Sequence, residues 1–198
     1  MFQKIREPFY KKIWFWIIIV VISFGIASYN NSNMINILNT KNSTKTEVEK
    51  DGIKKVDYEK FCNIKIGSNY EEVKSILGQY RKSEESEIDG VKVVIYTWYN
   101  YDNSNMNVIV KDGKVVGKAQ SGLSLENAEV NLIKYTKIQK GMNYSKVKDI
   151  LGGGKLMYVS KINGNIKSIY LWTNSNGSNM NVTFENGKVT VKNRLGLN

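Results

Sequence analysis

The stretch GSNYEEVKSILG at Gly67–Gly78 returns as GMNYSKVKDILG at Gly141–Gly152, 74 positions further along the chain. The same offset holds well beyond this stretch, because SNMNV at Ser104–Val108 returns at Ser178–Val182 without a gap. Self-similarity at one fixed period is typical of a repeated structural unit. The sequence therefore predicts a tandem duplication.

Each copy begins with signals for two short helices. Amphipathic segments at 57–64 and 129–138 come first, and a glycine ends each of them. Asn69 and Asn143 are then suitable N-cap residues for a second helix. Gly78 and Gly152 are suitable residues to end it, because glycine accepts the left-handed backbone found there.

Four extended segments follow the helices in each copy. Asp-Gly pairs at 89–90 and 112–113 separate them in the first copy, and Asn-Gly pairs at 163–164 and 186–187 in the second. Such pairs favour tight hairpin turns, because both central positions need positive φ. The predicted fold class is α+β, a tandem duplication of an αα-ββββ unit. In each unit a helix pair packs on a four-stranded antiparallel meander, and a transmembrane helix precedes both units.

Alternation along the strands suggests which side chains face the helices. Met106, Val108 and Val110 are expected to face them, and so are Val115 and Val189. The opposite face would then carry an aromatic and basic set that binds a partner. Its members are Tyr96, Trp98, Lys118, Tyr170, Trp172, Lys192 and Arg194. The alternative is that these tyrosines and tryptophans lie inside and pack the core.

The N-terminal region has the features of a membrane-targeting segment. Ile13–Ser28 carries no charge in 16 residues, which gives roughly 24 Å of helix against a hydrocarbon core of about 30 Å. Lys11 and Lys12 precede it, and basic flanks remain in the cytoplasm. We therefore expect a single-pass signal anchor with the C-terminal domain outside the cell membrane. A cleavable signal peptide, which would release a secreted protein, is the alternative.

The predicted organisation has five parts. Residues 1–12 form a basic cytoplasmic tail, 13–29 the anchor and 30–56 a disordered tether rich in Asn, Ser, Thr and Lys. The two repeats occupy 57–123 and 124–198.

Charge and composition limit the possible functions. The net charge is +11, and residues 124–198 contribute +7 of it, from eleven basic and four acidic side chains. This asymmetry is typical of a solvated, solubilising surface; the alternative is attraction to an acidic protein partner or an anionic envelope polymer. The chain has no histidine and one cysteine, Cys62, which excludes Ser-His-Asp and Cys-His nucleophile pairs and the usual zinc sites. We expect no enzyme activity, cofactor, metal or nucleic acid; the oligomeric state stays open.

The motifs resemble a known family. FCNIKIGSNYEEVKSILG and YTKIQKGMNYSKVKDILG are similar to the paired helices of the β-lactamase-inhibitor-protein (BLIP-like) superfamily, and MNVTFENGKVTVKNRLGL resembles its last strands. Single copies of such a unit occur in BamE/SmpA/OmlA-like envelope domains. The resemblance implies a concave, aromatic-rich sheet surface that grips another protein, with an acidic residue in a hairpin loop. Asp102 lies in the corresponding loop here.

These features favour a membrane-tethered extracytoplasmic module that binds a protein through an aromatic and basic sheet face. The alternative is a structural envelope protein held to anionic wall polymer or lipid head groups. Inhibition of a β-lactamase is a third possibility, although the chain lacks the disulfide cysteines of that family.

Overall fold

The computed structural model describes residues 54–124 and 127–198. The first repeat contains α2 and α3, followed by four strands. Their bounds are α2 Tyr58–Asn63, α3 Tyr70–Leu77, β1 Lys82–Ile88, β2 Val91–Tyr99, β3 Asn105–Lys111 and β4 Lys114–Ser121.

The second repeat follows the same order of elements. Their bounds are α4 Leu132–Lys137, α5 Tyr144–Leu151, β5 Lys155–Ile162, β6 Asn165–Thr173, β7 Asn179–Glu185 and β8 Lys188–Leu195.

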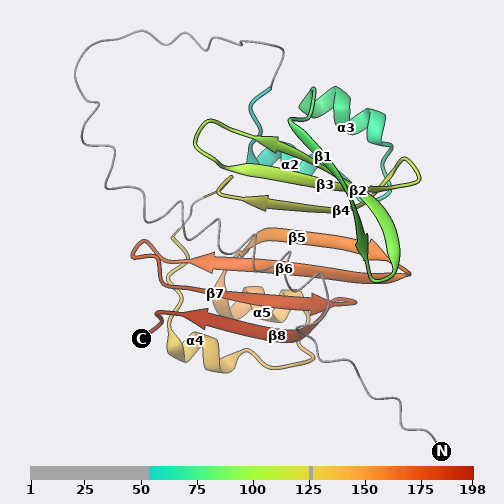
Figure 1. Cartoon of the computed structure of the whole chain (residues 1–198). Helices are drawn as coiled ribbons and strands as arrows, with labels where there is room; N and C mark the ends of the chain where they lie inside the picture. Colours follow the sequence, from blue (N-terminus) through green and yellow to red (C-terminus); the bar gives the residue numbers. More distant parts are fainter. Residues whose placement is uncertain (1–53, 125–126) are drawn as a thin grey trace, which may run out of the picture.

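All eight strands belong to one antiparallel sheet, in chain order from β1 to β8 (Figure 1). The two repeats meet where β4 pairs with β5, through Gly117↔Ser160, Lys118↔Val159 and Ala119↔Tyr158. This pairing satisfies backbone groups that two separate meanders would leave exposed at their edges.

The expected fold class is therefore wrong. The described chain is mostly one eight-stranded sheet with a few short helices, rather than an α+β arrangement of two separate helix-covered meanders. Within residues 54–124 and 127–198, no helix is long and apolar enough to cross a membrane. The expected tail at 1–12, anchor at 13–29 and most of the tether at 30–56 lie outside the described residues.

Both helix pairs pack on the same side of the sheet and build two equivalent cores. In the first, Phe61, Val73 and Leu77 of the helices bury Met106 and Val108 of β3. The second core repeats this packing with the following residues, most of them 74 positions on: Val147, Leu151, Met180 and Val182, with Ile138 beside them. The expectation that Met106, Val108, Val110, Val115 and Val189 face the helices is confirmed.

A third apolar cluster lies on the other side of the sheet, where no described helix packs. It contains Ile95, Ile109, Tyr158 and Ile169 among its buried members. The β1–β2 hairpin bends toward the β5–β6 hairpin (Figure 1), and the two turns meet where Asn163 Nδ2 donates a hydrogen bond to the Asp89 carbonyl oxygen at 3.3 Å. The sheet thus covers part of its own helix-free side.

The fixed period extends to individual hydrogen bonds. Asn100 accepts a hydrogen bond from the Val56 amide at 3.0 Å and donates one to the Val56 carbonyl at 2.7 Å. Asn174 makes the same pair of bonds with Val130, both at 2.7 Å. These contacts hold the loops after β2 and β6 against the segments that enter the helices.

Candidate functional site

The two tryptophans of the predicted binding face lie in the helix-covered cores. Trp98 and Trp172 are each 1% exposed. Trp98 pairs across the sheet with Met106, and Trp172 with Met180, so both point toward the helices. The assignment of Trp98 and Trp172 to an open face is therefore wrong.

The two tyrosines of that set lie on the same helix-covered side. Tyr96 stacks on Tyr70 of α3, with 4.0 Å between ring centroids, and Tyr170 lies 4.3 Å from Tyr144 of α5. Both are half-buried. Burial raises the pKa of the Tyr170 phenol and that of the Tyr70 phenol, which lies against Tyr96. These rings join helix to sheet.

The basic residues of the set also point toward the helices. Lys118 Nζ donates to the carbonyl oxygens of Phe61 and Ile64, both at 2.6 Å, and burial lowers the pKa of this amine. Lys192 Nζ donates to the carbonyls of Tyr135 and Ile138 at 2.9 and 2.7 Å. Both lysines therefore bind carbonyls at the ends of α2 and α4.

Arg194 also lies on the helix-covered side of the sheet. Its guanidinium donates to the Leu197 carbonyl at 3.1 Å and lies 5.6 Å from the centroid of the Tyr135 ring. The expected outward direction of Lys118, Lys192 and Arg194 is wrong because of a β-bulge in each fourth strand. The pairing shifts between Ile109 and Val110, and again between Thr183 and Phe184, and a bulge reverses the alternation beyond it.

Asp102 is the one member of the predicted set outside the helix-covered side. It is exposed in the loop after β2, where its Oδ1 accepts hydrogen bonds from the Ser104 amide at 2.9 Å and the Ser104 hydroxyl at 2.5 Å. The hydroxyl bond holds the pKa of the Asp102 carboxyl below its ordinary value. Next to it, Tyr101 is 90% exposed, so this loop presents an acid and a phenol to solvent.

The helix-free side of the sheet carries a different set of side chains, which sequence reasoning missed. One row crosses all eight strands by register, with Ala119, Tyr158 and Ile169 at its centre. Toward its ends the row is mostly polar: Lys82, Thr97 and Asn107 on one side, and Thr183 and Val191 on the other.

Amides and hydroxyls line this side and bind one another. Thr97 Oγ1 donates to Asn107 Oδ1 at 2.7 Å, and Asn193 Nδ2 donates to Asn181 Oδ1 at 3.1 Å. Tyr99, at 38% exposure, lies at the end of β2 on the same side. The repeated SNMNV motif could have predicted asparagines on this side, because they flank a methionine that faces the core and neighbouring strand residues point to opposite sides.

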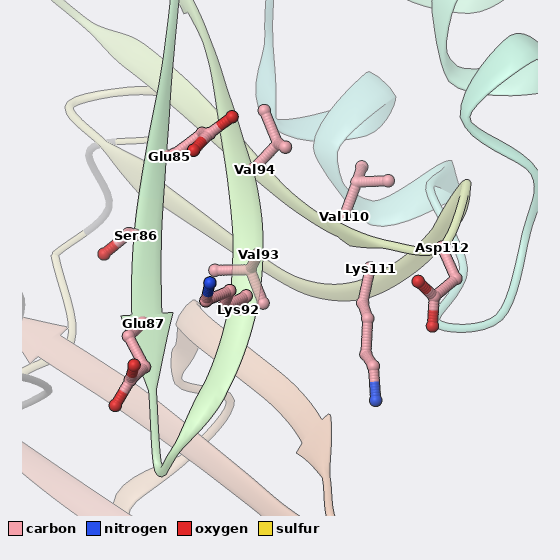
Figure 2. Close-up of a pocket in the computed structure, with 9 residues that line it drawn as sticks. All are labelled: Glu85, Ser86, Glu87, Lys92, Val93, Val94, Val110, Lys111 and Asp112. Carbon is pink, nitrogen blue, oxygen red and sulfur yellow. The ribbon is translucent and has the colours of Figure 1, made fainter.

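The β1–β2 hairpin leaves a gap beside β3. Pairing between β2 and β3 ends at Val94↔Val110, whereas the equivalent pair in the second repeat is followed by Lys167↔Glu185. The gap holds a cavity of about 460 Å³. Figure 2 shows that its lining is mixed, with charged and hydroxyl side chains beside three valines: Glu85, Ser86, Glu87, Lys92, Lys111 and Asp112, and Val93, Val94 and Val110.

The described residues offer no constellation for metal chemistry. Within residues 54–124 and 127–198, no group of three or more metal-ligating side chains comes together. The arrangement is that of one continuous sheet with a helix-free side and loops between its strands.

Comparison with known proteins agrees with this geometry. The profile of the β-lactamase inhibitor (BLIP) family matches residues 57–168 and again 134–198, as expected for a duplicated unit. The crystal structure of a "putative beta-lactamase inhibitor protein" from Streptococcus mutans superposes with a TM-score of 0.59 at 22% sequence identity, over 70% of this chain and 94% of that one. No curated protein matches the chain, and the similarity to BamE/SmpA/OmlA-like domains stays a prediction. Since the family profile covers more than half of the sequence, the chain belongs to the β-lactamase inhibitor (BLIP) family.

Proposed function

We propose that the chain is a protein-binding module that grips its partner with the helix-free side of the eight-stranded sheet. The observation that carries this proposal is the one-sided helix cover of the sheet: both helix pairs pack on one side, whereas on the other side Asn107, Asn181 and Asn193 are at least partly exposed on β3, β7 and β8. Membership of the inhibitor family supports a protein as the partner.

The chemistry of this side suits a partner with exposed backbone. Asn107, Asn181 and Asn193 carry both donors and acceptors, and they are only partly engaged with one another. Tyr99 and Tyr101 add aromatic surface at the rim, and tyrosine is a frequent anchor of protein interfaces. A serine β-lactamase is the first partner to test.

The loop at Tyr101 and Asp102 would enter the partner's cleft. Ser104 fixes the carboxylate of Asp102 through two hydrogen bonds, which lowers the entropy lost on binding. The net charge of +7 over residues 124–198 would steer an acidic protein toward the second repeat.

The test is a titration of purified class A β-lactamases with the full chain, followed by nitrocefin hydrolysis and by direct binding. We expect Asn107→Arg and Tyr101→Ala each to weaken binding by about tenfold or more. Asn69→Arg is the matched control, because Asn69 is exposed at the start of α3, on the helix side. Unchanged hydrolysis and absent binding for every enzyme would remove the β-lactamase proposal. Equal effects of Asn107→Arg and Asn69→Arg on a bound enzyme would remove the helix-free side as the site.

A second candidate function uses the opposite side of the second repeat. Lys137, Lys140, Lys146 and Lys148 are all exposed on and around α4 and α5. They would hold an anionic wall polymer or lipid head groups through their positive charge. Such binding should weaken steeply between low and high salt, and Lys146→Glu with Lys148→Glu should abolish it while sparing β-lactamase binding.

Either function would act outside the cytoplasm. The proposal rests on the uncharged stretch Ile13–Ser28 with Lys11 and Lys12 before it, which is typical of segments that direct export. A reporter fused after residue 198 and assayed for periplasmic or surface activity tests it, and activity only in the cytoplasm would contradict it.

A further inference from the structure

The internal duplication makes the two edges of the sheet equivalent to the two strands that join the repeats. The edge strand β8 corresponds to β4, and the edge strand β1 corresponds to β5. Subtracting 74 takes Val191–Asn193 to Gly117–Ala119, and adding 74 takes Glu84–Ser86 to Tyr158–Ser160. These equivalents are the residues that pair at the junction between β4 and β5.

The backbone beside the junction is arranged alike in β4 and β8. Val115 of β4 exchanges hydrogen bonds with Gly67 and Ser68, at 2.8 and 2.9 Å. Val189 of β8 does so with Gly141 and Met142, at 2.9 and 2.8 Å. Two residues later, β4 meets β5, whereas β8 is the last strand of the described sheet. The backbone at the edge of β8 is thus held in the same way as the edge of β4, which pairs with β5.

Apolar side chains are exposed on β8 and α4 where their equivalents are covered. Leu132, Val191 and Leu195 are 37%, 44% and 53% exposed. Ser121, the equivalent of Leu195, is 4% exposed, and Gly117, the equivalent of Val191, is buried. Tyr58, the equivalent of Leu132, accepts a hydrogen bond at its hydroxyl from the Leu156 amide of β5 at 2.8 Å. Exposed apolar side chains beside an open strand edge are typical of an interaction surface.

The two edges carry opposite charge. β1 has the sequence KSEESEI, with three glutamates and one lysine. β8 has the sequence KVTVKNRL, with two lysines, one arginine and no acid. Opposite charges across paired strands stabilise the pair, and like charges destabilise it.

We propose that β8 of one copy of the chain pairs antiparallel with β1 of a second copy, in the register of the internal junction. That register sets Val191 opposite Ser86, Lys192 opposite Glu85 and Asn193 opposite Glu84. The contact joins two different surfaces, so it extends head to tail. It continues the eight-stranded sheet into a longer one and leaves the helix-free side uncovered.

The contact between copies is weaker than the internal junction. A Cβ at Gly117 would lie 2.9 Å from Ile109 Cδ1 and 3.2 Å from Ser160 Cβ, so β4 and β5 approach closely because of this glycine. β8 has Val191 at the equivalent position, with the shorter Thr183 in place of Ile109. The strands therefore pair at a wider spacing, and the association is reversible and dependent on concentration.

The register is tested by cross-linking the full chain in a Cys62→Ser background, which removes its one cysteine. Glu84→Cys and Asn193→Cys variants are mixed and treated with a short bismaleimide. We expect a cross-linked dimer from the mixture and little from either variant alone. Glu84→Cys mixed with Lys188→Cys is the matched control, since Lys188 lies five residues away on the same strand.

The charges are tested by sedimentation of full-chain variants over a range of concentrations. Glu85→Lys and Arg194→Glu should each weaken self-association by about tenfold, whereas Glu59→Lys on α2 should leave it unchanged. Mixing the Glu85→Lys and Arg194→Glu chains should restore dimers, because the native β8 of the Glu85→Lys chain can then pair with the native β1 of the Arg194→Glu chain. A monomer at all concentrations, a dimer insensitive to Glu85→Lys, or cross-linking of Asn193→Cys mainly to itself would each overturn the proposal. Circular dichroism establishes that each variant is folded.

Discussion

The indole Nε1 of Trp98 donates a hydrogen bond to the carbonyl oxygen of Gly78 at 3.2 Å, and Trp172 repeats this bond to Gly152 at 3.0 Å. Gly78 and Gly152 follow α3 and α5 with φ of 75° and 82°. Each tryptophan therefore ties the second strand of its repeat to the end of the helix packed above it. Both tryptophans therefore stabilise the fold, and their 1% exposure leaves no ring surface for a partner to contact.

Truncation of a tryptophan should destabilise the protein strongly. Trp172→Ala removes a fully buried ring and leaves the Gly152 carbonyl without its donor, so we expect a loss of about 3–5 kcal/mol in the free energy of unfolding. Urea unfolding of the full chain measures it. Tyr101→Ala is the control and should change stability by less than about 0.5 kcal/mol, because Tyr101 is 90% exposed. Similar small effects of both variants would contradict the burial of Trp172.

Two neighbouring glycines should respond in opposite ways to the same substitution. A Cβ at Gly154 would lie 2.5 Å from Trp172 Cζ2, whereas a Cβ at Gly153 would meet nothing within 4 Å. Gly154→Ala should cost about 1–3 kcal/mol through overpacking. Gly153→Ala should be neutral or stabilise by up to about 1 kcal/mol, because it restricts the unfolded chain. Thermal unfolding of the two variants compares them directly, and equal melting temperatures would refute the close contact.

The faces of the strands could have been predicted better from hairpin register than from alternation alone. Alternation correctly predicts that Met106 faces the helices, and in a hairpin with a symmetric loop Met106 lies opposite Trp98. Residues in directly opposed positions share a face, so Trp98 had to face the helices as well. Alternation favours the aliphatic residues Ile169 and Leu171 of the second strand as the core set, but Ile169 belongs to a further apolar cluster on the helix-free side.

The bulges and the junction were harder to predict. The bulge in β4 turns the side chain of Lys118 toward the helices. A glycine within a strand, here Gly117, can indicate such a bulge. However, β8 has Val191 at the equivalent position and contains a bulge as well. The β4–β5 junction involves three residue pairs of moderate polarity. No local pattern marks them, because the pairing depends on how two repeats approach in space. The helix pairs and hairpin turns, in contrast, depend on local capping and turn chemistry.

Removal of the Lys118 amine should lower the free energy of unfolding more than removal of the equivalent Lys192 amine. Lys118 is 5% exposed, and its Nζ binds the carbonyls of Phe61 and Ile64 as well as that of Cys62 at 3.2 Å. Lys118→Met keeps the apolar stem but leaves these acceptors unpaired, so we expect a loss of about 2–4 kcal/mol. Lys192→Met should cost less, because Lys192 is only half-buried. Chemical unfolding gives both values, and the reverse order would contradict this account.

Asp102 should make the free energy of unfolding depend on pH in the acid range, whereas the equivalent position of the second repeat should not. The equivalent residue is Asn176, whose Oδ1 accepts the same two bonds from Ser178, at 3.0 and 2.7 Å. Asp102→Asn should therefore leave stability at neutral pH within about 1 kcal/mol of the wild type, since the site is exposed.

The sign of this dependence follows from the lowered pKa of Asp102 in the folded chain. The unfolded chain binds the proton more readily, so the stabilisation by the carboxylate is complete above the ordinary pKa of 3.8. It is lost as pH falls from there through the lower folded pKa. Plotted against pH, the difference in unfolding free energy between wild type and Asp102→Asn should be flat above that range and decline within it. Asn176→Asp should introduce the same decline from the second repeat, and a flat difference for both variants would show that Ser104 and Ser178 do not bind these side chains in solution.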